Sequence, residues 1–410
     1  MRTVIRDPIH GYIELDDGAV AVIDTAEMQR LRRIRQLGFS YLVYPGANHT
    51  RFEHSLGTYH LMNVLLDALE VKKEEEKELL VASLIHDVGH GPYSHAMEPV
   101  IKKFTGRSHE DIEDLLFAQD AGAEPSAASI AEVLEEQRLD KRKILEHIKG
   151  KNEGNARELS KILNGEIDVD KMDYLVRDSY YTGVAYGVVD NIRLIRGLDF
   201  VNGSLVITAK GVLPAEYLLF SRFLMYPTVY AHHTSRIAQV MFLKAVVHFV
   251  ESKSEDDRRQ YARALRTMDD SEIHIALRNA EGYPKEIIER INERRLFKRA
   301  VYTGITELRA GTAEELTDEK RIRDVEEEIS KRAGVDEKYV IVDFQGQKEE
   351  ELKESVAKVF FGDACRSLRE VSSLVSMLSR VFRENYKLGV YTLEKHRGAV
   401  KKAAEAVLQC

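Results

Sequence analysis

Cysteine is almost absent from this sequence, and its scarcity excludes several classes of protein. The chain has only Cys365 and Cys410, which lie far apart and form no Cys-x-x-Cys pair. A disulfide framework and a cysteine-rich zinc site are therefore excluded, and a reducing compartment is indicated. The first residues have no signal-peptide pattern, and no apolar run approaches membrane-spanning length. We expect a cytoplasmic protein that does not enter a membrane.

An excess of positive charge is also missing. The formal net charge is −8, with 60 Lys and Arg against 68 Asp and Glu. That balance argues against a dedicated nucleic-acid binder. Charged residues make up 31% and hydrophobic residues 44% of the 410 residues, which is typical of a globular protein. The length is enough for a large core and for two domains.

The densest group of chemically active side chains is the stretch Ile85–His95, which holds three histidines and one aspartate. Residues 76–84 have a helical pattern, and the helix should end within the glycine- and proline-containing part of the stretch. His86 and Asp87 then lie in its last turn, with His90 one turn further on. A buried carboxylate needs compensation, and histidine with carboxylate is a ligand set for a divalent transition metal. The alternative is a helix end at which histidine caps the last carbonyls.

Two further predicted helices carry polar residues among apolar ones. One runs from about 51 to 71 and contains His54, and the other includes 167–178. In the second, three polar residues recur every four positions and share one face, with Lys171 adjacent to them: Asp170, Tyr174 and Asp178. That face is either solvated or turned into a cleft, and its apolar surroundings favour the cleft.

An arginine-rich helix is predicted near the N-terminus. Asp24-Thr25 offers an N-cap, and the helical spacing continues to about Gln36. The helix contains Arg30, Arg32, Arg33 and Arg35. They form either a solvated basic face or an anion site, since arginine forks match phosphate.

The whole pattern predicts a mainly α fold. We expect an all-helical core (1–255) with a short hairpin in residues 1–23, and a smaller C-terminal α+β region (256–410). Residues 72–77 read as a charged connection. Other expected helices are 94–105, one opening at His109-Glu110, pieces within 119–160 and long helices within 213–250. Expected strands are 205–208, 299–302, 339–343 and 388–392.

His54, His86-Asp87 and Asp170 form the pattern H…HD…D, and the sequence resembles the HD-domain metal-dependent phosphohydrolases. The match is close to the sterile-alpha-motif-and-HD type deoxynucleoside triphosphate triphosphohydrolases, here without the sterile-alpha-motif domain. The segments that carry the resemblance follow the family's order and lie within the first 180 residues: Asp7–Gly11, Asp24–Gly38, Arg51–Gly57, His86–His95 and Ile167–Asp178.

The resemblance implies a set of roles around one divalent metal ion. The implied metal ligands are His54, His86, Asp87 and Asp170. The implied acid/base residues are His90, Glu98 and His109, although the family often has Asp at the position of Glu98. The implied phosphate contacts are Arg51, His95, Lys171 and Tyr174, and the implied sugar contacts are Gln36, Leu37 and Asp178. Mn, Fe, Co, Ni, Zn and Mg remain equally open as the metal, and Mg²⁺ is also an option as the nucleotide's own counterion.

Several of these residues have ordinary structural alternatives. Arg51 can pair with Glu53 or Asp87, Tyr174 can belong to the core, and Leu37 can be a packing residue. In a later helix the family has a phosphate-binding Arg, then a His, and then a Tyr-Gln pair. Alignment on Tyr230 places Arg222 at the Arg, Tyr226 at the His and Ala231 at the Gln, and Arg222 can equally be a solvated residue.

The resemblance also implies a regulatory nucleotide between subunits, in a dimer or a tetramer. Residues that match Asp24, Gln29 and Arg32 read a guanine base in that branch. Asp can accept from the guanine ring N–H and amino group, while Arg and Gln can donate to its acceptors. The alternative is an N-cap Asp followed by a solvated polar face. Position 6, a ligand contact in the branch, is Arg6 here.

Three functions follow from these observations. The first is metal-dependent hydrolysis of a deoxynucleoside triphosphate to deoxynucleoside and tripolyphosphate. The second is hydrolysis of nucleoside monophosphates or another phosphoester at the same centre. The third is a non-catalytic nucleotide sensor, against which the complete ligand set argues.

Overall fold

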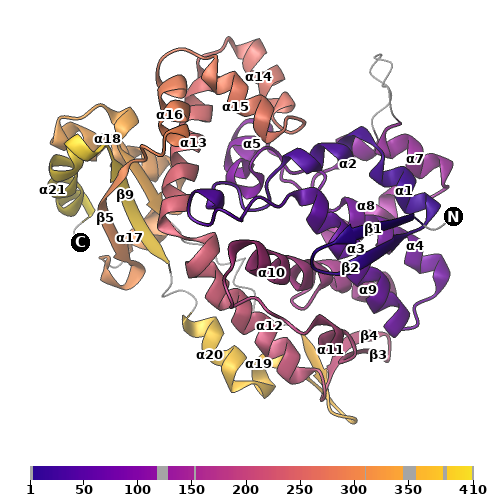
Figure 1. Cartoon of the computed structure of the whole chain (residues 1–410). Helices are drawn as coiled ribbons and strands as arrows, with labels where there is room; N and C mark the ends of the chain where they lie inside the picture. Colours follow the sequence, from indigo (N-terminus) through magenta and orange to yellow (C-terminus); the bar gives the residue numbers. More distant parts are fainter. Residues whose placement is uncertain are drawn as a thin grey trace.

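Helices dominate the chain in the computed structural model (Figure 1). The structure describes residues 3–117, 128–151, 154–309, 311–344, 357–381 and 386–408. Some of the helical pieces expected within 119–160 therefore fall partly outside the described residues. The mainly α fold with an N-terminal hairpin and a C-terminal α+β part is confirmed.

The N-terminal half begins with the hairpin and continues with a series of helices. The hairpin pairs β1 (Thr3–Asp7) with β2 (Gly11–Leu15) in antiparallel register. The helices that follow are α1 (Asp17–Ile23), α2 (Ala26–Arg30), η1 (Leu31–Arg33), η2 (Ser40–Leu42), α3 (Arg51–Ala68), α4 (Lys73–Ile85), η3 (Ser94–Ala96), α5 (Glu98–Thr105), α6 (Glu113–Leu116), α7 (Ile130–Glu136), α8 (Lys141–Lys149), α9 (Gly154–Asn164), α10 (Val169–Thr182) and α11 (Asn191–Ile195).

The second half begins with β3 (Leu198–Val201), β4 (Ser204–Thr208), α12 (Val212–Met225), the π-helical turn η4 (Tyr226–Tyr230) and α13 (His233–Glu251). The remaining elements are α14 (Glu255–Ala264), α15 (Asp270–Arg278), α16 (Tyr283–Asn292), β5 (Lys298–Gly304), η5 (Ile305–Glu307), α17 (Thr312–Glu315), α18 (Glu319–Ala333), η6 (Glu337–Tyr339), β6 (Ile341–Phe344), β7 (Lys358–Phe360), β8 (Cys365–Ser367), α19 (Leu368–Val371), α20 (Ser373–Val381), β9 (Lys387–Thr392), η9 (Glu394–His396) and α21 (Arg397–Leu408).

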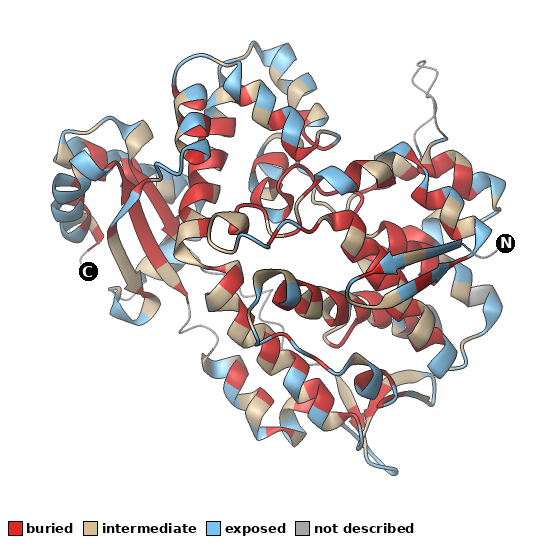
Figure 2. Cartoon of the chain, in the orientation of Figure 1, coloured by how far each residue is buried: buried red, intermediate tan, exposed pale blue. Residues whose placement is uncertain are grey.

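Three helices form the frame of the site. The long helix α3 packs against α4 and α10, and their apolar faces belong to one buried cluster. Helix α4 ends at Ile85, where the chain enters the glycine-rich stretch, and α10 is started by Asp168, whose carboxylate accepts from Lys171 N at 2.8 Å. Figure 2 shows buried residues gathered on the inward sides of the helices. Polar residues on these inward sides are the exceptions that need a chemical explanation.

Strands of the C-terminal part belong to two small sheets. The order β5-β9-β6 is antiparallel throughout, and α18 and α21 pack beside it. The other sheet has the order β3-β4-β7-β8, with β4 parallel to β7. Strands from both sides of residue 255 therefore share one sheet. No helix among the described residues is long and apolar enough to cross a membrane.

Several local predictions were wrong near the N-terminus. The hairpin was expected within residues 1–23 but ends at Leu15, because Asp16 is the N-cap of α1 and accepts from Ala19 N at 2.7 Å. Of the expected N-cap pair, Thr25 is the N-cap residue of α2, whereas Asp24 is the C-cap of α1, and the expected helix to Gln36 stops after η1. The chain becomes extended there because Arg35 forms a bridge with Thr50.

Three other helix boundaries also differ from the prediction. The charged residues 73–77 are the first turns of α4 and not a connection. The expected helix 94–105 is divided into η3 and α5, with Pro99 in the first turn of α5. The residues at 109–110 lie in a turn, and the next helix begins at Glu113.

Candidate metal centre and active site

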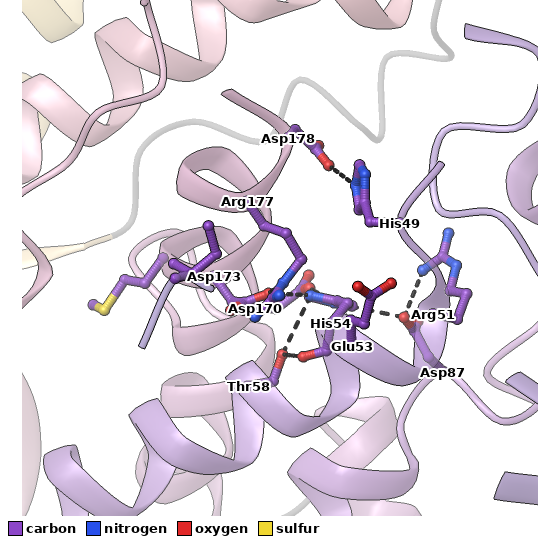
Figure 3. A network of polar contacts seen from close by, with 12 residues as sticks. His49, Arg51, Glu53, His54, Thr58, Asp87, Asp170, Asp173, Arg177 and Asp178 are labelled. Atoms are coloured by element: carbon purple, nitrogen blue, oxygen red, sulfur yellow. Dashed lines mark hydrogen bonds and ion pairs between the residues drawn. The ribbon is translucent and has the colours of Figure 1, made fainter. Parts of the chain in front are cut away.

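Four predicted ligands converge from α3, from the residues that follow α4 and from the first turn of α10, and Figure 3 labels His54, Asp87 and Asp170 among them. His54, His86 and Asp170 place one ligand atom each within 4.8 Å of one another. The Nε2 atom of His54 lies 2.9 Å from Asp170 Oδ1, and that of His86 lies 3.7 Å from it. Asp87 is next to both imidazoles, at 3.5 Å from each Nε2. The group therefore combines two imidazole nitrogens with two carboxylates.

The two imidazoles are prepared to bind a cation. Each Nδ1 already has a partner: His54 Nδ1 lies 2.8 Å from Asp173 Oδ2, and His86 Nδ1 lies 2.7 Å from Ser83 O. Both Nε2 atoms are buried and have no hydrogen-bond partner among the described residues. A buried polar atom without a partner is costly, and a metal ion between these atoms removes that cost. The residues present fit one divalent metal ion.

The charges around His54 support the same conclusion. Burial by itself lowers the pKa of His54, but the neighbouring carboxylates of Asp170 and Asp173 outweigh it and raise the pKa to about 10. Burial raises the pKa of Asp170, yet His54 and His86 hold it well below its usual range. The cluster therefore attracts positive charge, and a mixed nitrogen and oxygen ligand set suits a divalent transition metal.

The sequence reasoning missed a buried network behind His54. Asp173 Oδ1 lies 2.6 Å from His10 Nε2, and Arg177 Nε and Nη2 donate to the Asp173 carboxylate at 2.9 Å. Arg177 Nη1 also donates to Asp7 at 2.8 Å, so the N-terminal hairpin is tied to the metal ligand. Figure 3 shows Asp173 and Arg177 beside His54. The signals that could have found this network were the buried positions of Asp173 and Arg177 one turn apart, and the Asp7–Gly11 segment.

A glycine makes the network possible. A Cβ at Gly57 would lie 1.8 Å from Asp173 Oδ1 and 2.4 Å from Arg177 Nη2. Any side chain at Gly57 would therefore displace the carboxylate that orients His54. Burial raises the pKa of Asp173, but Arg177 and the two histidines hold it well below its ordinary value, so the group is an anion.

Replacing Asp173 with Asn is expected to weaken metal binding by about 10–100-fold, because partners that orient a ligating histidine contribute that much to affinity. Asn can still lie beside Arg177, but it no longer supplies the negative charge that fixes the His54 tautomer. Equilibrium dialysis against Mn²⁺ with a competing chelator measures the change. Asp190→Asn is the matched control, because exposed Asp190 only caps α11. Equal affinity in the two variants would show that Asp173 has no part in holding the ion.

A second cluster lies on the other side of Asp87. His109 Nδ1 is 2.7 Å from Glu98 Oε1, and the rings of His90 and His109 are stacked with centroids 4.1 Å apart. Burial acts to lower the pKa of His109, but the Glu98 carboxylate raises it above the usual value. Burial, together with Arg51 and His109, lowers the pKa of His90 well below the usual range. One imidazole therefore favours the protonated form and its neighbour favours the neutral form.

His95 completes this cluster at its exposed edge. Its Nδ1 lies 3.2 Å from Glu98 Oε2, so Glu98 contacts two imidazoles at once. Glu98 thus occupies an orienting position even though the resembled family often has Asp there. His90, His95 and His109 also place one ligand atom each within 4.8 Å of one another. Metal analysis must therefore count the ions per chain.

All predicted substrate contacts line one pocket of about 710 Å³ next to these clusters. The predicted residues that line it are Gln36, Leu37, Arg51, His95, Lys171, Tyr174, Asp178 and Arg222, together with His86, Asp87, His90, Glu98, His109 and Asp170. His54 lies behind this wall and is fully buried.

The cationic residues of the pocket are already held by partners. Arg51 Nη1 donates to Asp87 at 2.6 Å, so the alternative in which the two pair is present in the structure. Lys171 Nζ donates to Asp168 at 2.6 Å and to Gly165 O at 3.0 Å. Arg222 is partly buried and lines the pocket together with Tyr174 and Tyr230, so its position is compatible with the predicted phosphate contact. Three positive charges in one pocket are suited to a phosphorylated substrate.

Asp178 contacts His49 and Tyr230, and nothing in the sequence indicated that these residues lie next to it. His49 Nε2 lies 2.8 Å from Asp178 Oδ1, and the Tyr230 hydroxyl donates to Asp178 Oδ2 at 2.9 Å. The π-helical turn η4 has a wider turn than an α-helix and brings both Tyr226 and Tyr230 to the pocket wall. Tyr226 thus occupies the wall at the position where the resembled family has His.

The three predicted regulatory residues lie outside this pocket. Asp24 is exposed, and Gln29 Nε2 donates to Ile23 O at 2.9 Å. Arg32 Nε donates to Gln29 Oε1 at 2.9 Å, and its guanidinium lies 3.5 Å above the Phe52 ring. The side chains of Gln29 and Arg32 already make hydrogen bonds with neighbouring groups. The guanine site stays a prediction.

Comparisons with known proteins agree with this geometry. A model of the HD domain matches residues 51–178, and a model of an HD-associated region matches residues 189–410. An uncharacterized protein of Methanocaldococcus jannaschii is 34% identical over 95% of this chain and 78% of its own length. The deoxynucleoside triphosphate triphosphohydrolase SAMHD1 of Homo sapiens is 32% identical over 74% of this chain, and the match covers 55% of SAMHD1.

Solved structures are similar over nearly the whole chain. A hypothetical protein from Aquifex aeolicus has a TM-score of 0.76 and 28% identity, covering 98% of this chain and 100% of that one. A phosphohydrolase from Bacteroides thetaiotaomicron has a TM-score of 0.75 and 26% identity, covering 96% of this chain and 100% of that one.

Proposed function

The chain belongs to the HD-domain phosphohydrolase family with an HD-associated region, and from this premise we propose that it hydrolyses deoxynucleoside triphosphates to deoxynucleoside and tripolyphosphate. The family and the fold support a hydrolase. The name of the SAMHD1 relative suggests the substrate class, although the match spans little more than half of that protein.

One observation carries the proposal: a group that fits a divalent metal ion opens into the same pocket as Arg51, Lys171 and Arg222. The ion, when bound, supplies an acidified water and polarises a phosphoryl oxygen. The three cationic side chains bind and orient the phosphates. In this proposal His109, which is held by Glu98, gives a proton to the leaving sugar oxygen, and Asp178, which lines the same pocket, contacts the sugar.

A specific difference keeps a second function open. Tyr226 and Ala231 stand where the resembled family has His and Gln, so the part of the pocket that reads the nucleoside differs. A nucleoside monophosphate or another phosphoester could use the same metal ligands and cationic residues. A non-catalytic nucleotide sensor would not need an imidazole, that of His109, held by the Glu98 carboxylate.

A nucleotide screen with product analysis tests these alternatives. The metal-loaded protein is incubated with each deoxynucleoside mono- and triphosphate, and the products are separated by anion exchange. Tripolyphosphate with free deoxynucleoside supports the proposal. Free phosphate from monophosphates supports the second function, and binding without turnover supports the sensor.

We propose further that a guanine nucleotide at Asp24, Gln29 and Arg32 activates the enzyme by promoting a larger homo-oligomer. Arg32→Ala is expected to abolish activation by GTP and the accompanying increase in mass, with metal content unchanged. The reason is that a ligand that bridges subunits stabilises assembly by mass action. Light scattering and initial rates with and without GTP measure both effects. Arg193→Ala, at an exposed residue of α11, is the control. An unchanged mass with hyperbolic kinetics for the wild type would end the hypothesis.

A further inference from the structure

The loop that follows the metal ligands has an unusual backbone. Tyr93 and Ser94 are consecutive non-glycine residues with φ of 56° and 57°, in the left-handed region that L-residues rarely adopt. Such a conformation persists only when its surroundings hold it. The Tyr93 ring is stacked on Phe39 at 4.4 Å and lies edge-on to Phe242 at 4.8 Å, which fixes the side chain. The backbone needs a separate partner.

That partner is Asp270, at the start of α15 and within the HD-associated region. Its Oδ1 accepts from Tyr93 N at 2.6 Å, and its Oδ2 accepts from Arg35 N at 3.1 Å. Asp270 is buried, and burial raises its pKa to about 6, so the carboxylate is ionised at neutral pH. Both oxygens are therefore used to hold two separate backbone segments of the active site.

The two segments that Asp270 holds are also joined by Ser94. The Ser94 hydroxyl donates to Arg35 O at 2.6 Å and accepts from Arg51 Nε at 2.9 Å. Arg51 in turn pairs with Asp87. The contacts thus form a continuous path from Asp270 through the Tyr93-Ser94 turn to the guanidinium in the pocket.

The corner between α14 and α15, residues 268–270, is linked to the same loop a second time, through the side chain of Arg30. Buried Arg30 donates to Met268 O at 2.9 Å, to Val88 O at 2.6 Å and to His90 O at 2.9 Å. Residues 268–270 are therefore linked to the loop twice, directly by Asp270 at Tyr93 and indirectly through Arg30 at Val88 and His90.

We propose that Asp270 is a positioning residue: it holds the strained Tyr93-Ser94 turn, and through Ser94 it sets the direction of Arg51 in the phosphate pocket. The corner at residues 268–270 gives the HD-associated region a direct role in the active site. The backbone part of this proposal is independent of the substrate, whereas the effect on turnover rests on the proposed function.

Asp270→Asn is the decisive variant because each of the two carboxylate oxygens of Asp270 accepts a backbone hydrogen bond. An amide has one acceptor and one donor group, so Asn can accept from only one of the two backbone N–H groups and presents its NH₂ to the other. Asp269→Asn is the matched control. Asp269 Oδ1 caps α15 by accepting from Ser271 N and Glu272 N, which Asn does equally well, and its other oxygen pairs with Arg33.

Hydrogen exchange of the whole, metal-loaded chain measures directly how firmly Asp270 holds the Tyr93-Ser94 turn. Peptides that cover residues 88–97 are expected to exchange at least about tenfold faster in Asp270→Asn, since a hydrogen bond to a charged acceptor is lost. Asp269→Asn should exchange like the wild type, and the melting temperature of both variants reports global stability. Equal exchange at 88–97 in Asp270→Asn and Asp269→Asn would overturn the proposal, whether or not any substrate is known.

The rate of turnover measures how the loss of this support affects catalysis. With a deoxynucleoside triphosphate as substrate, Asp270→Asn should lower kcat/KM on the order of tenfold or more with an unchanged number of metal ions per chain. Ser94→Ala should lower kcat/KM similarly while its 88–97 peptides exchange no more than about twofold faster. Full activity in Ser94→Ala would overturn the path through Ser94. If the wild type hydrolyses none of these substrates, the proposed function fails, and the exchange result still decides the role of Asp270.

Discussion

Asp170→Asn is expected to purify with little bound metal and to lose at least about a thousandfold in turnover. Asp170 supplies one of two negative charges to the proposed ion and lies 2.9 Å from His54 Nε2. Losing a metal's charge stabilisation costs several kcal/mol, and about 4 kcal/mol corresponds to roughly a thousandfold in rate. Elemental analysis of the purified protein and initial rates after addition of Mn²⁺ measure the two effects.

Asp170 is a cleaner target than Asp87 for this experiment. Asp87→Ala should also lose the metal, but Asp87 pairs with buried Arg51. Breaking a buried pair costs about 3–5 kcal/mol because one charge is left alone, so the variant could fail by unfolding. The Asp170 side chain is 31% exposed, and Asn is nearly its size.

The control for Asp170→Asn is Asp190→Asn, the same change at the exposed cap of α11. Metal content and rate should match the wild type there. Removing the ion from the wild type with a chelator should reproduce the loss of activity, and adding it back should restore activity. Wild-type metal content in Asp170→Asn, or full activity after chelation, would contradict the assigned centre.

Local chemistry in the sequence singled out only His86 and Asp87, which are adjacent at the end of an apolar helix. His54 and Asp170 entered the predicted ligand set through the resemblance, and the structure brings their side chains close to His86 and Asp87. The substrate contacts followed from the resemblance, and the structure places all of them around one pocket.

The residues that hold those ligands could not be predicted, because their contacts depend on tertiary packing. His10 lies 163 positions from its partner Asp173, and Tyr93 lies 177 positions from Asp270. The hydrophobic periodicity of the sequence describes each helix or strand separately and does not indicate contacts between residues so far apart. The helix expected up to Gln36 failed for the same reason: the chain at Arg35 leaves the helix for a bridge with Thr50.

His109→Ala is expected to reduce kcat by about 10²–10⁴ with metal content intact, as for the loss of a general acid. In the proposed reaction water attacks the α-phosphorus and the sugar oxygen leaves, and His109 protonates that oxygen. Exposed His248 on α13 offers the control His248→Ala, which should behave like the wild type. Loss of bound metal in His109→Ala would instead identify His109 as a ligand.

The pH dependence separates an acid from a residue that only binds. A general acid must be protonated, so kcat falls as the pH rises through the pKa of His109. Glu98 raises the pKa of His109 against the effect of burial, and Glu98→Gln should therefore move the alkaline limb of kcat to lower pH. Hydrolysis in ¹⁸O-labelled water should place the label in tripolyphosphate, because the bond from the α-phosphorus to the sugar oxygen breaks. Label in free monophosphate, or an alkaline limb that does not move in Glu98→Gln, would refute the role of His109 as the acid that protonates the sugar.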